Sequence, residues 1–442
     1  MVFQHECQGP GLAYTEDNNF KVRLFDLVNA LARSLDMVSH TLAGHHTNVG
    51  FFAARIAECY GLSSFERRNV VFAAMLHDIG AVSLYPAVDS LLFEDDTIKH
   101  SIAGSVIISS SKKLQDVSKL VEYHHTPWEE LRGENKRYEI SNIINLADFI
   151  DVNTRRDRPA RLQVPLLIEL CRKHSGRLFN PDYIEALREA ESKRDYYHRL
   201  YSERTEKKLR LSTQFESDML DAEGVLDFTG LFAKVIDFRS RFTATHSQGV
   251  AITSSVLGRW LGFNEVEQAL FQIAGRLHDI GKLAVPTTLL EKNDKLTSSE
   301  FSAIQRHAVY TEHILSGVPG LEVIRDWACQ HHERIDGTGY PKGIAGKEIS
   351  LGSRILQVAD VFTAITEDRP YRRGMDFKQT TKVLRQLGDS NKLDPIVVEV
   401  LIERYDEIND LRCKGQTLAL EHFSNYSKVL YNKYGIVSKD IS

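Results

Sequence analysis

The sequence GRLHDIGKLAVP at Gly275–Pro286 and the sequence HHERIDGTGYP at His331–Pro341 decide how the rest of this chain is arranged. A lone His307 stands between them, and His246 and Asp360 stand on either side. Imidazole and carboxylate groups suit iron, manganese, zinc and similar divalent metals. Because adjacent residues on a helix point about 100° apart, a His-Asp doublet can aim two side chains into one pocket. The stretch therefore predicts a metal site whose ligands come from several helical segments.

The C-terminal half offers seven side chains of metal-ligand type: His246, His278, Asp279, His307, His331, His332 and Asp360. A carboxylate carries two oxygens and can bridge two cations. Two cations about 3.5–4 Å apart can clamp both oxygens of an in-line phosphoryl displacement. We therefore expect these groups to converge on a pair of cations in one phosphate-sized hollow, with the apolar segment Leu270–Gly275 as a dry wall.

The same order of residues occurs earlier in the chain, at His45, His77, Asp78, His100, His124, His125 and Asp148. The first three stand 201 residues before their counterparts, the next three 207 before and the last 212 before. Gly61 and Gly262 also keep the separation of 201. Both length changes fall between candidate ligands. An internal repeat of this kind predicts two similar units, so we expect a duplicated helical domain.

Apolar residues recur at helical rather than strand spacing, as in the stripe Leu24, Leu27, Val28, Leu31 and Leu35. Such a stripe is typical of an amphipathic helix. We therefore expect an all-α protein with two helical bundles in tandem, joined by a long helical linker. The expected bounds are a first copy at 1–182, the linker at 183–225, a second copy at 226–412 and a helical C-terminal tail at 413–442.

The segment Tyr183–Phe215 is rich in charged residues and tyrosine and contains no glycine or proline. One interpretation is a connecting helix that is mostly solvated. The other is a helix whose apolar edge pairs with a domain or with its symmetry mate. Pairing with the symmetry mate would make the protein a homodimer.

Bulk composition narrows the class of partner. A net charge of −5 gives no sign of a nucleic-acid polymer or an anionic membrane. The five cysteines show neither disulfide nor zinc-ribbon spacing, which fits a reducing cytosol. The N-terminal MVFQHECQGP lacks the features of a signal peptide, and the apolar runs are far shorter than a membrane span. We expect a cytoplasmic protein.

The combination of HDIGK, a separate histidine and HHExxDGxGYP resembles the HD-GYP domain of the HD-domain phosphohydrolases, from about Asp227 to Leu401. The resemblance implies an all-α HD core. It also implies metal-dependent hydrolysis of a cyclic dinucleotide, either cyclic di-GMP or 3′,3′-cyclic GMP-AMP. The product would be a linear dinucleotide, and mononucleotides if that product is cut again.

The resemblance also implies roles for individual residues. All seven C-terminal side chains would be ligands of two divalent ions, iron or manganese, with Asp279 bridging them. Some family members hold a third ion through a glutamate where this chain has Phe242, so we expect a dinuclear site. Lys282 would contact the scissile phosphate, where a cation offsets developing charge.

Three further residues are expected at the substrate. Arg369 and Arg372, in EDRPYR, resemble a family arginine loop and would grip phosphate or guanine. A surface ion pair is the alternative. Tyr340 would either stack on a base or pack to shape its own loop. In the family this Gly-Tyr-Pro loop is also linked to contacts with cyclic-dinucleotide synthases.

The first copy departs from the second at two places. Ala81 replaces Lys282, and TPWEELRGEN at Thr126–Asn135 replaces the Gly-Tyr-Pro loop, while RDRPAR at Arg156–Arg161 echoes EDRPYR. We expect this half to be regulatory. It would bind metal, nucleotide or the second half, and would turn over slowly or not at all. A metal-free relic of the duplication is the competing hypothesis.

Two other functions stay open. The chain could be another HD-type phosphohydrolase that cleaves nucleoside triphosphates or alarmones, although the loop DGTGYP and the segment DRPYR argue against this. It could also be a non-catalytic receptor that binds a cyclic dinucleotide and signals through the linker. The intact second ligand set and Lys282 argue against the receptor.

Overall fold

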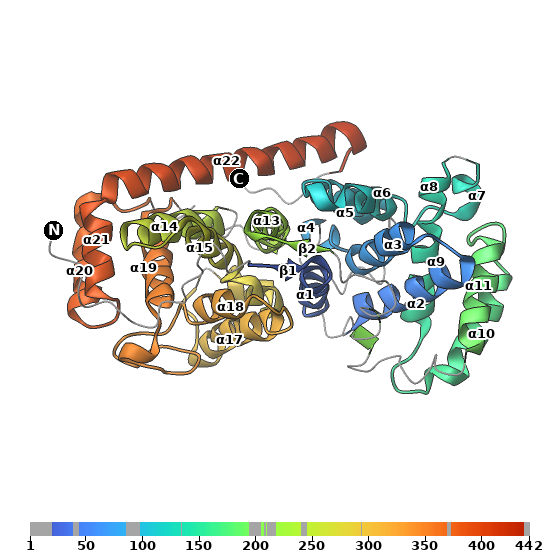
Figure 1. Cartoon of the computed structure of the whole chain (residues 1–442), viewed down its shortest axis with the longest axis horizontal. Helices are drawn as coiled ribbons and strands as arrows, with labels where there is room; N and C mark the ends of the chain where they lie inside the picture. Colours follow the sequence, from blue (N-terminus) through green and yellow to red (C-terminus); the bar gives the residue numbers. More distant parts are fainter. Residues whose placement is uncertain are drawn as a thin grey trace. The chain divides into compact units, whose positions relative to one another are not determined.

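The computed structural model of this chain describes residues 20–38, 44–84, 98–133, 135–193, 205–206, 209, 218–239, 245–292, 294–368 and 373–436. Helices dominate these residues (Figure 1), and the expected all-α architecture is confirmed. Two strands of two residues each, β1 (Val22–Arg23) and β2 (Met219–Leu220), pair in a small sheet that the sequence did not predict. No described helix combines the length and apolar content that a membrane crossing requires.

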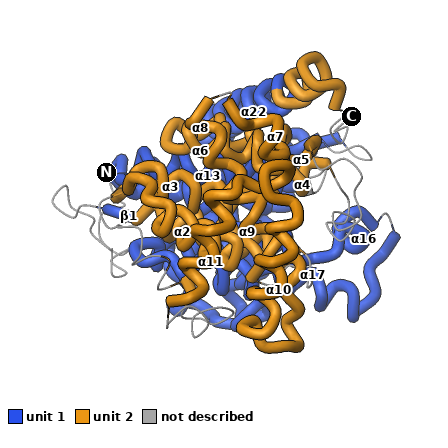
Figure 2. Tube along the Cα trace, turned by 90° about the vertical axis from the view of Figure 1, so that its right-hand side faces the viewer, with its two compact units in different colours: residues 1–22, 220–425 blue, residues 23–219, 426–442 orange. Residues whose placement is uncertain are grey.

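The chain forms two compact units, coloured separately in Figure 2. The N-terminal unit comprises Arg23–Met219 and Tyr426–Ser442, and the C-terminal unit comprises Met1–Val22 and Leu220–Asn425. The final helix α22 (Tyr405–Tyr434) therefore contributes residues to both units. It covers the helical stretch expected in the tail.

The N-terminal unit is built from short and medium helices. They are α1 (Leu24–Asp36), α2 (His45–Tyr60), α3 (Ser64–Leu76), α4 (Ala81–Leu84), α5 (Ile98–Ile108), η3 (Lys112–Leu114), α6 (Gln115–Glu122), α7 (Trp128–Leu131), α8 (Lys136–Glu139), α9 (Asn142–Asn153), α10 (Ala160–Arg172) and α11 (Pro181–Ser192). Helix α2 packs against α3, α9 and α11. The predicted stripe on α1 is buried, and Phe25, Phe52 and Phe72 fill the core between α1, α2 and α3.

The C-terminal unit repeats this plan. Its elements are α13 (Ala222–Arg239), α14 (His246–Trp260), α15 (Glu265–Leu277), η5 (Ile280–Ala284), α16 (Thr287–Leu290), α17 (Ser298–Leu315), α18 (Glu322–Cys329), η6 (Gly346–Glu348), α19 (Leu351–Thr366), α20 (Phe377–Asp389), α21 (Pro395–Glu403) and the first part of α22. Helix α14 packs against α15 and α19, and α17 packs against η5 and α18.

The two units turn the same corner with the same residues. Gly61 after α2 and Gly262 after α14 have φ of 88° and 89°, a left-handed conformation that glycine adopts without a Cβ clash. Two residues later, Ser63 and Asn264 begin α3 and α15 with a capping box that uses Glu66 and Glu267. The repeat seen at the candidate ligands therefore extends to the turn that orients the helix before each His-Asp doublet.

The first part of the expected linker differs from a solvated helix. Residues Tyr183, Ile184 and Leu187 of α11 are buried, and α11 packs on α2 within the N-terminal unit. Residues 194–204 of the expected linker lie outside the described residues. The domain bounds and the linker helix remain predictions.

Candidate metal centres

The His-Asp doublet of the C-terminal unit lies at the end of α15, where the chain tightens into η5. His278 is the C-cap of α15, and its Nε2 lies 3.1 Å from Oδ2 of Asp279. From the start of α14, His246 places Nε2 3.0 Å from Oδ1 of Asp360 on α19. Residues His246, His278 and Asp360 form one group whose ligand atoms all lie within 4.8 Å of one another.

A second group stands on the other side of Asp279. His307 on α17 places its Nε2 3.4 Å from Nε2 of His331, which follows α18. The distances from Oδ1 of Asp279 to these two atoms are 3.5 Å and 3.9 Å. Since Oδ2 faces His278, Asp279 presents one oxygen to each group, and His332 completes the second group. All seven side chains expected from the sequence are thus brought together.

Backbone hydrogen bonds settle which ring nitrogen points inward. The Nδ1 atoms of His278, His307 and His331 donate to the carbonyls of Gly275, Ile304 and Ala328 at 2.8, 2.7 and 2.6 Å. A neutral imidazole that donates from Nδ1 has only a lone pair on Nε2. Two such lone pairs therefore face each other between His307 and His331. That geometry is repulsive by itself and suits a cation between them.

The pKa shifts of these side chains favour the protonation states that metal binding needs. Burial lowers the pKa of His307 to about 4 and that of His332 to about 3, so both rings are neutral near pH 7. Burial acts to raise the pKa of Asp279, but the charges of His278 and Lys282 outweigh it and hold that pKa well below its usual value. Neutral imidazoles and ionised carboxylates are the forms that bind metal.

Lys282, in η5, lies against the bridging carboxylate. Its Nζ is 2.6 Å from Oδ2 of Asp279, and about a quarter of its side chain (24%) is exposed, against 1% for Asp279. The ammonium group is thus held against the carboxylate by a side chain that is only partly exposed. This is compatible with the expected contact to a phosphate, which remains a prediction.

The glycine of the HDIG motif explains why α17 comes so close. A Cβ on Gly281 would lie 2.0 Å from the carbonyl oxygen of His307, and a Cβ on Gly80 would lie 2.1 Å from the carbonyl oxygen of His100. Only glycine allows this approach. The close packing is what brings a histidine from a separate helix to each His-Asp doublet.

The Gly-Tyr-Pro loop closes over one edge of the centre. The backbone N–H of Tyr340 donates to the carbonyl of His332 at 3.1 Å, and the two rings lie 4.7 Å apart. Glu333 is buried and accepts from the backbone N–H of Lys342 at 2.6 Å, which ties the loop down. Tyr340 therefore packs against a candidate ligand, and stacking on a base stays a prediction. The expected Arg369 and Arg372, and Phe242, lie outside the described residues.

Two carboxylates near the centres were not expected from the sequence. Oε2 of Glu367, just after α19, lies 3.4 Å from Nδ1 of His246. In the N-terminal unit, Oδ2 of Asp151 lies 2.9 Å from Nδ1 of His45. A carboxylate behind a histidine ligand fixes its ring and raises its basicity. Comparison of the two copies does not reveal them, because Asp151 lies within α9 and Glu367 lies beyond α19, at positions that are not equivalent.

A pair of aspartates does keep the separation of 201 residues, and the repeat could have revealed it. Asp36 accepts from Nδ1 of His46 at 2.6 Å. Its counterpart Asp237 on α13 has a buried Oδ1 without a hydrogen-bond partner among the described residues. Burial raises the pKa of Asp237 well above the usual value. Ser247 stands where the first copy has His46, so the second copy has lost that partner.

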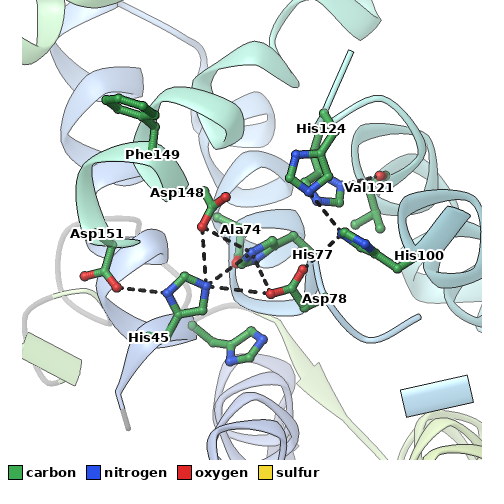
Figure 3. Close-up of polar contacts among 12 residues, drawn as sticks. His45, Ala74, His77, Asp78, His100, Val121, His124, Asp148, Phe149 and Asp151 are labelled. Carbon is green, nitrogen blue, oxygen red and sulfur yellow. Dashed lines mark hydrogen bonds and ion pairs between the residues drawn. The ribbon is translucent and has the colours of Figure 1, made fainter. Parts of the chain in front are cut away.

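The N-terminal unit also brings its seven expected residues together, as Figure 3 shows for most of them. His45, His77 and Asp78 form one candidate group, and Asp78, His100, His124 and His125 form another. Oδ1 of Asp148 on α9 lies 3.4 Å from Nε2 of His45.

Comparisons with known proteins agree with this duplicated geometry. A family model described as an HD domain matches residues 230–397, and another with the same description matches residues 42–153. The 3′3′-cGAMP-specific phosphodiesterase 1 of Vibrio cholerae is 34% identical over 412 residues, which cover 89% of this chain and 94% of that protein. A cyclic di-GMP phosphodiesterase of Pseudomonas aeruginosa is 34% identical over 199 residues, 44% of this chain and 47% of that protein.

A solved structure shares the fold. The crystal structure of a cyclic GMP-AMP-specific phosphodiesterase from V. cholerae matches with a TM-score of 0.62 at 21% identity, over 87% of this chain and 98% of that chain. The matched domains, the near full-length relative and the two clustered ligand sets agree with one another. This chain therefore belongs to the HD-domain family of cyclic-dinucleotide phosphodiesterases, as a member with two HD domains in tandem.

Proposed function

We propose that the C-terminal unit hydrolyses a cyclic dinucleotide at a centre of two divalent cations. The observation that carries this proposal is the clustering of Asp279 with six other side chains of metal-ligand type, in which the Nε2 atoms of His307 and His331 are only 3.4 Å apart. One ion position would use His246, His278, Asp279 and Asp360. The other would use Asp279, His307, His331 and His332. The imidazoles of the two positions together favour iron or manganese over magnesium.

Bound cations would supply Lewis acidity and a nucleophile derived from water. The chain's own groups would do the rest. Asp279 would hold both ion positions at a fixed separation. The partly exposed ammonium group of Lys282 would offset negative charge that develops on the phosphoryl group. Tyr340 would border the substrate on the side of His332.

Among cyclic dinucleotides, we propose 3′,3′-cyclic GMP-AMP as the preferred substrate, with cyclic di-GMP as the alternative. The supporting observation is the name of one relative. The V. cholerae protein that matches this chain over 94% of its own length is named for specificity toward 3′3′-cGAMP. The product would be the linear dinucleotide, with further cleavage to mononucleotides.

The test is product analysis of the full chain, loaded with iron or manganese and given each cyclic dinucleotide separately. Asp279→Ala should abolish cleavage, because it removes the bridge between the two ion positions. Asp78→Ala, the matched change in the first copy, should leave much of the activity. Hydrolysis of linear triphosphates alone would overturn the proposal, and protection of the ligand without any product would favour a receptor.

Three further properties are proposed from the sequence. A homodimer formed through the linker, contacts of the Gly-Tyr-Pro loop with synthases, and a cytoplasmic location follow from the sequence reasoning alone. Sedimentation of the full chain tests the first of these, and a dimer that dissociates on substitutions at Tyr197 and Leu200 would support it.

A further inference from the structure

Three exposed leucines lie in a row on α10 of the N-terminal unit. The exposed fractions of Leu162, Leu166 and Leu170 are 64%, 71% and 36%. Residues four apart on a helix lie on the same face, so these side chains form one apolar row, here called the leucine stripe. The opposite face of α10 packs through Val164 and Ile168, which are buried. The leucine stripe is therefore additional to the surface that holds the helix in its unit.

The second copy contains a counterpart of α10, namely α20. Helix α10 contacts α9 and α11, and α20 contacts α19 and α21 in the same way. The helices that follow also begin alike, with a capping side chain and a proline at Asn180-Pro181 in α11 and at Asp394-Pro395 in α21. The two helices thus occupy the same place in the two units and can be compared residue by residue.

The comparison shows that the fold does not require the leucine stripe. A separation of 216 residues places Val164 on Thr380 and Ile168 on Leu384, and all four side chains are buried. The same separation places the three leucines on exposed polar residues, which are Lys378, Lys382 and Gln386. One copy therefore has ordinary solvated side chains where the other has leucine. A row of exposed leucines that packing does not need marks a surface for a partner.

The chain around the leucine stripe is basic. Residues 155–177 hold seven arginines and lysines against two acidic residues, a local charge of +5 in a chain whose total is −5. Both acidic side chains are already paired. Asp157 accepts from Arg155 at 2.8 Å, and Glu169 accepts from Arg172 at 2.9 Å. The bulk charge thus hides a local excess of positive charge on this part of the N-terminal unit.

Three of the basic side chains flank the leucine stripe. Arg161 lies in the first turn of α10 and Lys173 directly follows the helix, and both are exposed. Arg158 is exposed in the preceding loop, which Gln163 ties to α10. Nε2 of Gln163 donates to the carbonyls of Arg155 and Arg158, and its Oε1 accepts from the backbone N–H of Arg155, all at 3.0 Å. The positive charges are therefore held beside the leucines.

An apolar stripe between positive charges discriminates among partners. A second copy of this face would bring +5 against +5, and like charges repel. A nucleic-acid polymer would neutralise the arginines but would leave the leucines in water. An anionic bilayer meets both requirements, because its headgroups attract basic side chains and its acyl chains accept leucine.

From these observations we propose that α10 docks the N-terminal unit on an anionic lipid surface. The helix lies in the plane of the interface, with the leucine stripe among the acyl chains and with Arg158, Arg161 and Lys173 at the headgroups. Three leucines and three basic residues support reversible binding to the surface. The proposal is independent of the proposed function, since α10 carries none of the candidate metal ligands.

The test is flotation of the full chain with vesicles made of about equal parts phosphatidylglycerol and phosphatidylcholine, at about 0.1 M salt, where the Debye length is about 10 Å. The wild-type chain should float with these vesicles and should stay in solution with vesicles of phosphatidylcholine alone. Raising the salt to about 1 M should release most of the bound protein, because screening weakens the attraction to the headgroups.

Two triple variants separate the apolar contribution from the electrostatic one. The stripe variant, Leu162→Gln/Leu166→Gln/Leu170→Gln, should bind about 10²-fold more weakly, because it keeps every charge but has no leucine to bury. The charge variant, Arg158→Gln/Arg161→Gln/Lys173→Gln, should lose about as much affinity. The matched control replaces three exposed apolar residues of the C-terminal unit and should bind as wild type does, as Ile396→Gln/Leu418→Gln/Leu420→Gln.

A fluorescence reporter tests the depth of insertion. In Leu166→Trp the added indole should be quenched by lipids brominated in their acyl chains, whereas the indole added in Leu418→Trp should not. Circular dichroism confirms that each variant is folded. The proposal is overturned if wild type does not float with the anionic vesicles, or if the folded stripe variant floats as well as wild type. It is also overturned if sedimentation shows a dimer that the stripe variant abolishes, since the leucines would then bind a second copy.

Discussion

At the scale of single residues, the two centres solve one problem with different side chains. His45 and His246 begin equivalent helices, and a carboxylate lies against Nδ1 of each ring. In one unit, Asp151 does this from the middle of α9, and in the other, Glu367 does it from just beyond α19. The contact to Nδ1 of the first histidine is thus made in both units, but by residues at positions that are not equivalent. Alignment of the two copies finds ligands, but it does not find the carboxylates behind them.

Glu367→Gln should weaken metal binding at the C-terminal centre by about 10- to 100-fold, because the neutral amide orients His246 less firmly and makes it a weaker base. Manganese affinity of the folded variant is the measurement. Glu403→Gln, at an exposed glutamate of α21, serves as the control. Unchanged affinity in both variants would show that the 3.4 Å contact has no role in holding the ring.

Lys282→Ala should lower the rate of cyclic-dinucleotide cleavage by about 10²- to 10³-fold, the usual cost of removing a group that meets transition-state charge. Metal content should not fall, since the substitution removes a competing cation from Asp279. Turnover and bound manganese are measured on the same sample, with Lys347→Ala in the exposed η6 as control. A loss of metal together with activity would assign Lys282 a structural role instead.

At the scale of elements, each centre depends on how closely one helix approaches a 3₁₀ turn or its equivalent. Gly281 and Gly80 permit that approach, and the shared corner at Gly61 and Gly262 aims the preceding helix. The histidines of α17 and α5 reach their doublets only because no Cβ intervenes. The glycine of HDIG is thus as necessary to the centre as the ligands beside it.

Gly281→Ala should destabilise the C-terminal unit by about 1–3 kcal/mol, because the new methyl group would overlap the carbonyl of His307 and displace α17. Thermal unfolding checks this. Gly230→Ala in α13 is the matched control, since a Cβ there meets nothing within 4 Å and should instead favour the helix slightly. Equal melting temperatures for Gly281→Ala and wild type would contradict the packing argument.

Sequence reasoning identified the seven side chains that cluster in each unit because they stand in short motifs that recur at fixed separations. It found the all-α class because apolar spacing reflects burial on helices such as α1. It left the packing of α11 open, since Tyr183 and Leu187 stand at the start of a charged segment that fits either a solvated helix or a helix packed on a domain. It missed Glu367 and Asp151, because contacts between distant segments follow from the fold rather than from spacing.

At the scale of the whole molecule, the two centres give the chain many buried histidines and a marked response to pH. Among the described residues, five rings have a lowered pKa, chiefly through burial: His124, His125, His307, His331 and His332. Three have a raised pKa because nearby carboxylates outweigh burial: His45, His77 and His246. The lowered group is the larger, so it decides the sign in mildly acid solution.

The metal-free chain should therefore lose stability as the pH falls from 6.5 toward 4. In that window, unfolded histidines with a pKa near 6.5 take up protons, whereas folded His307 and His332, with pKa values of about 4 and 3, do not. The raised pKa of His246, about 9, acts in the opposite sense, since its contribution is full below pH 6.5 and is lost as the pH rises toward 9.

Urea unfolding of metal-stripped protein at pH 7 and pH 5, followed by helical circular dichroism, measures this effect. The midpoint should be lower at pH 5, and His332→Gln should reduce the difference by removing one titrating ring. A midpoint that is the same at both values would show that the buried rings take up protons without cost.

The carbonyls that accept from Nδ1 of His278, His307 and His331 each belong to the residue three positions earlier. The orientation of each ring is thus set by the local helical turn. Once that turn has formed, Nε2 already points toward the candidate metal position. Ions should then bind a preformed site without changing the backbone conformation. Far-ultraviolet spectra of stripped and loaded protein should accordingly overlay, and uptake should proceed at the pace of diffusion and dehydration rather than of folding.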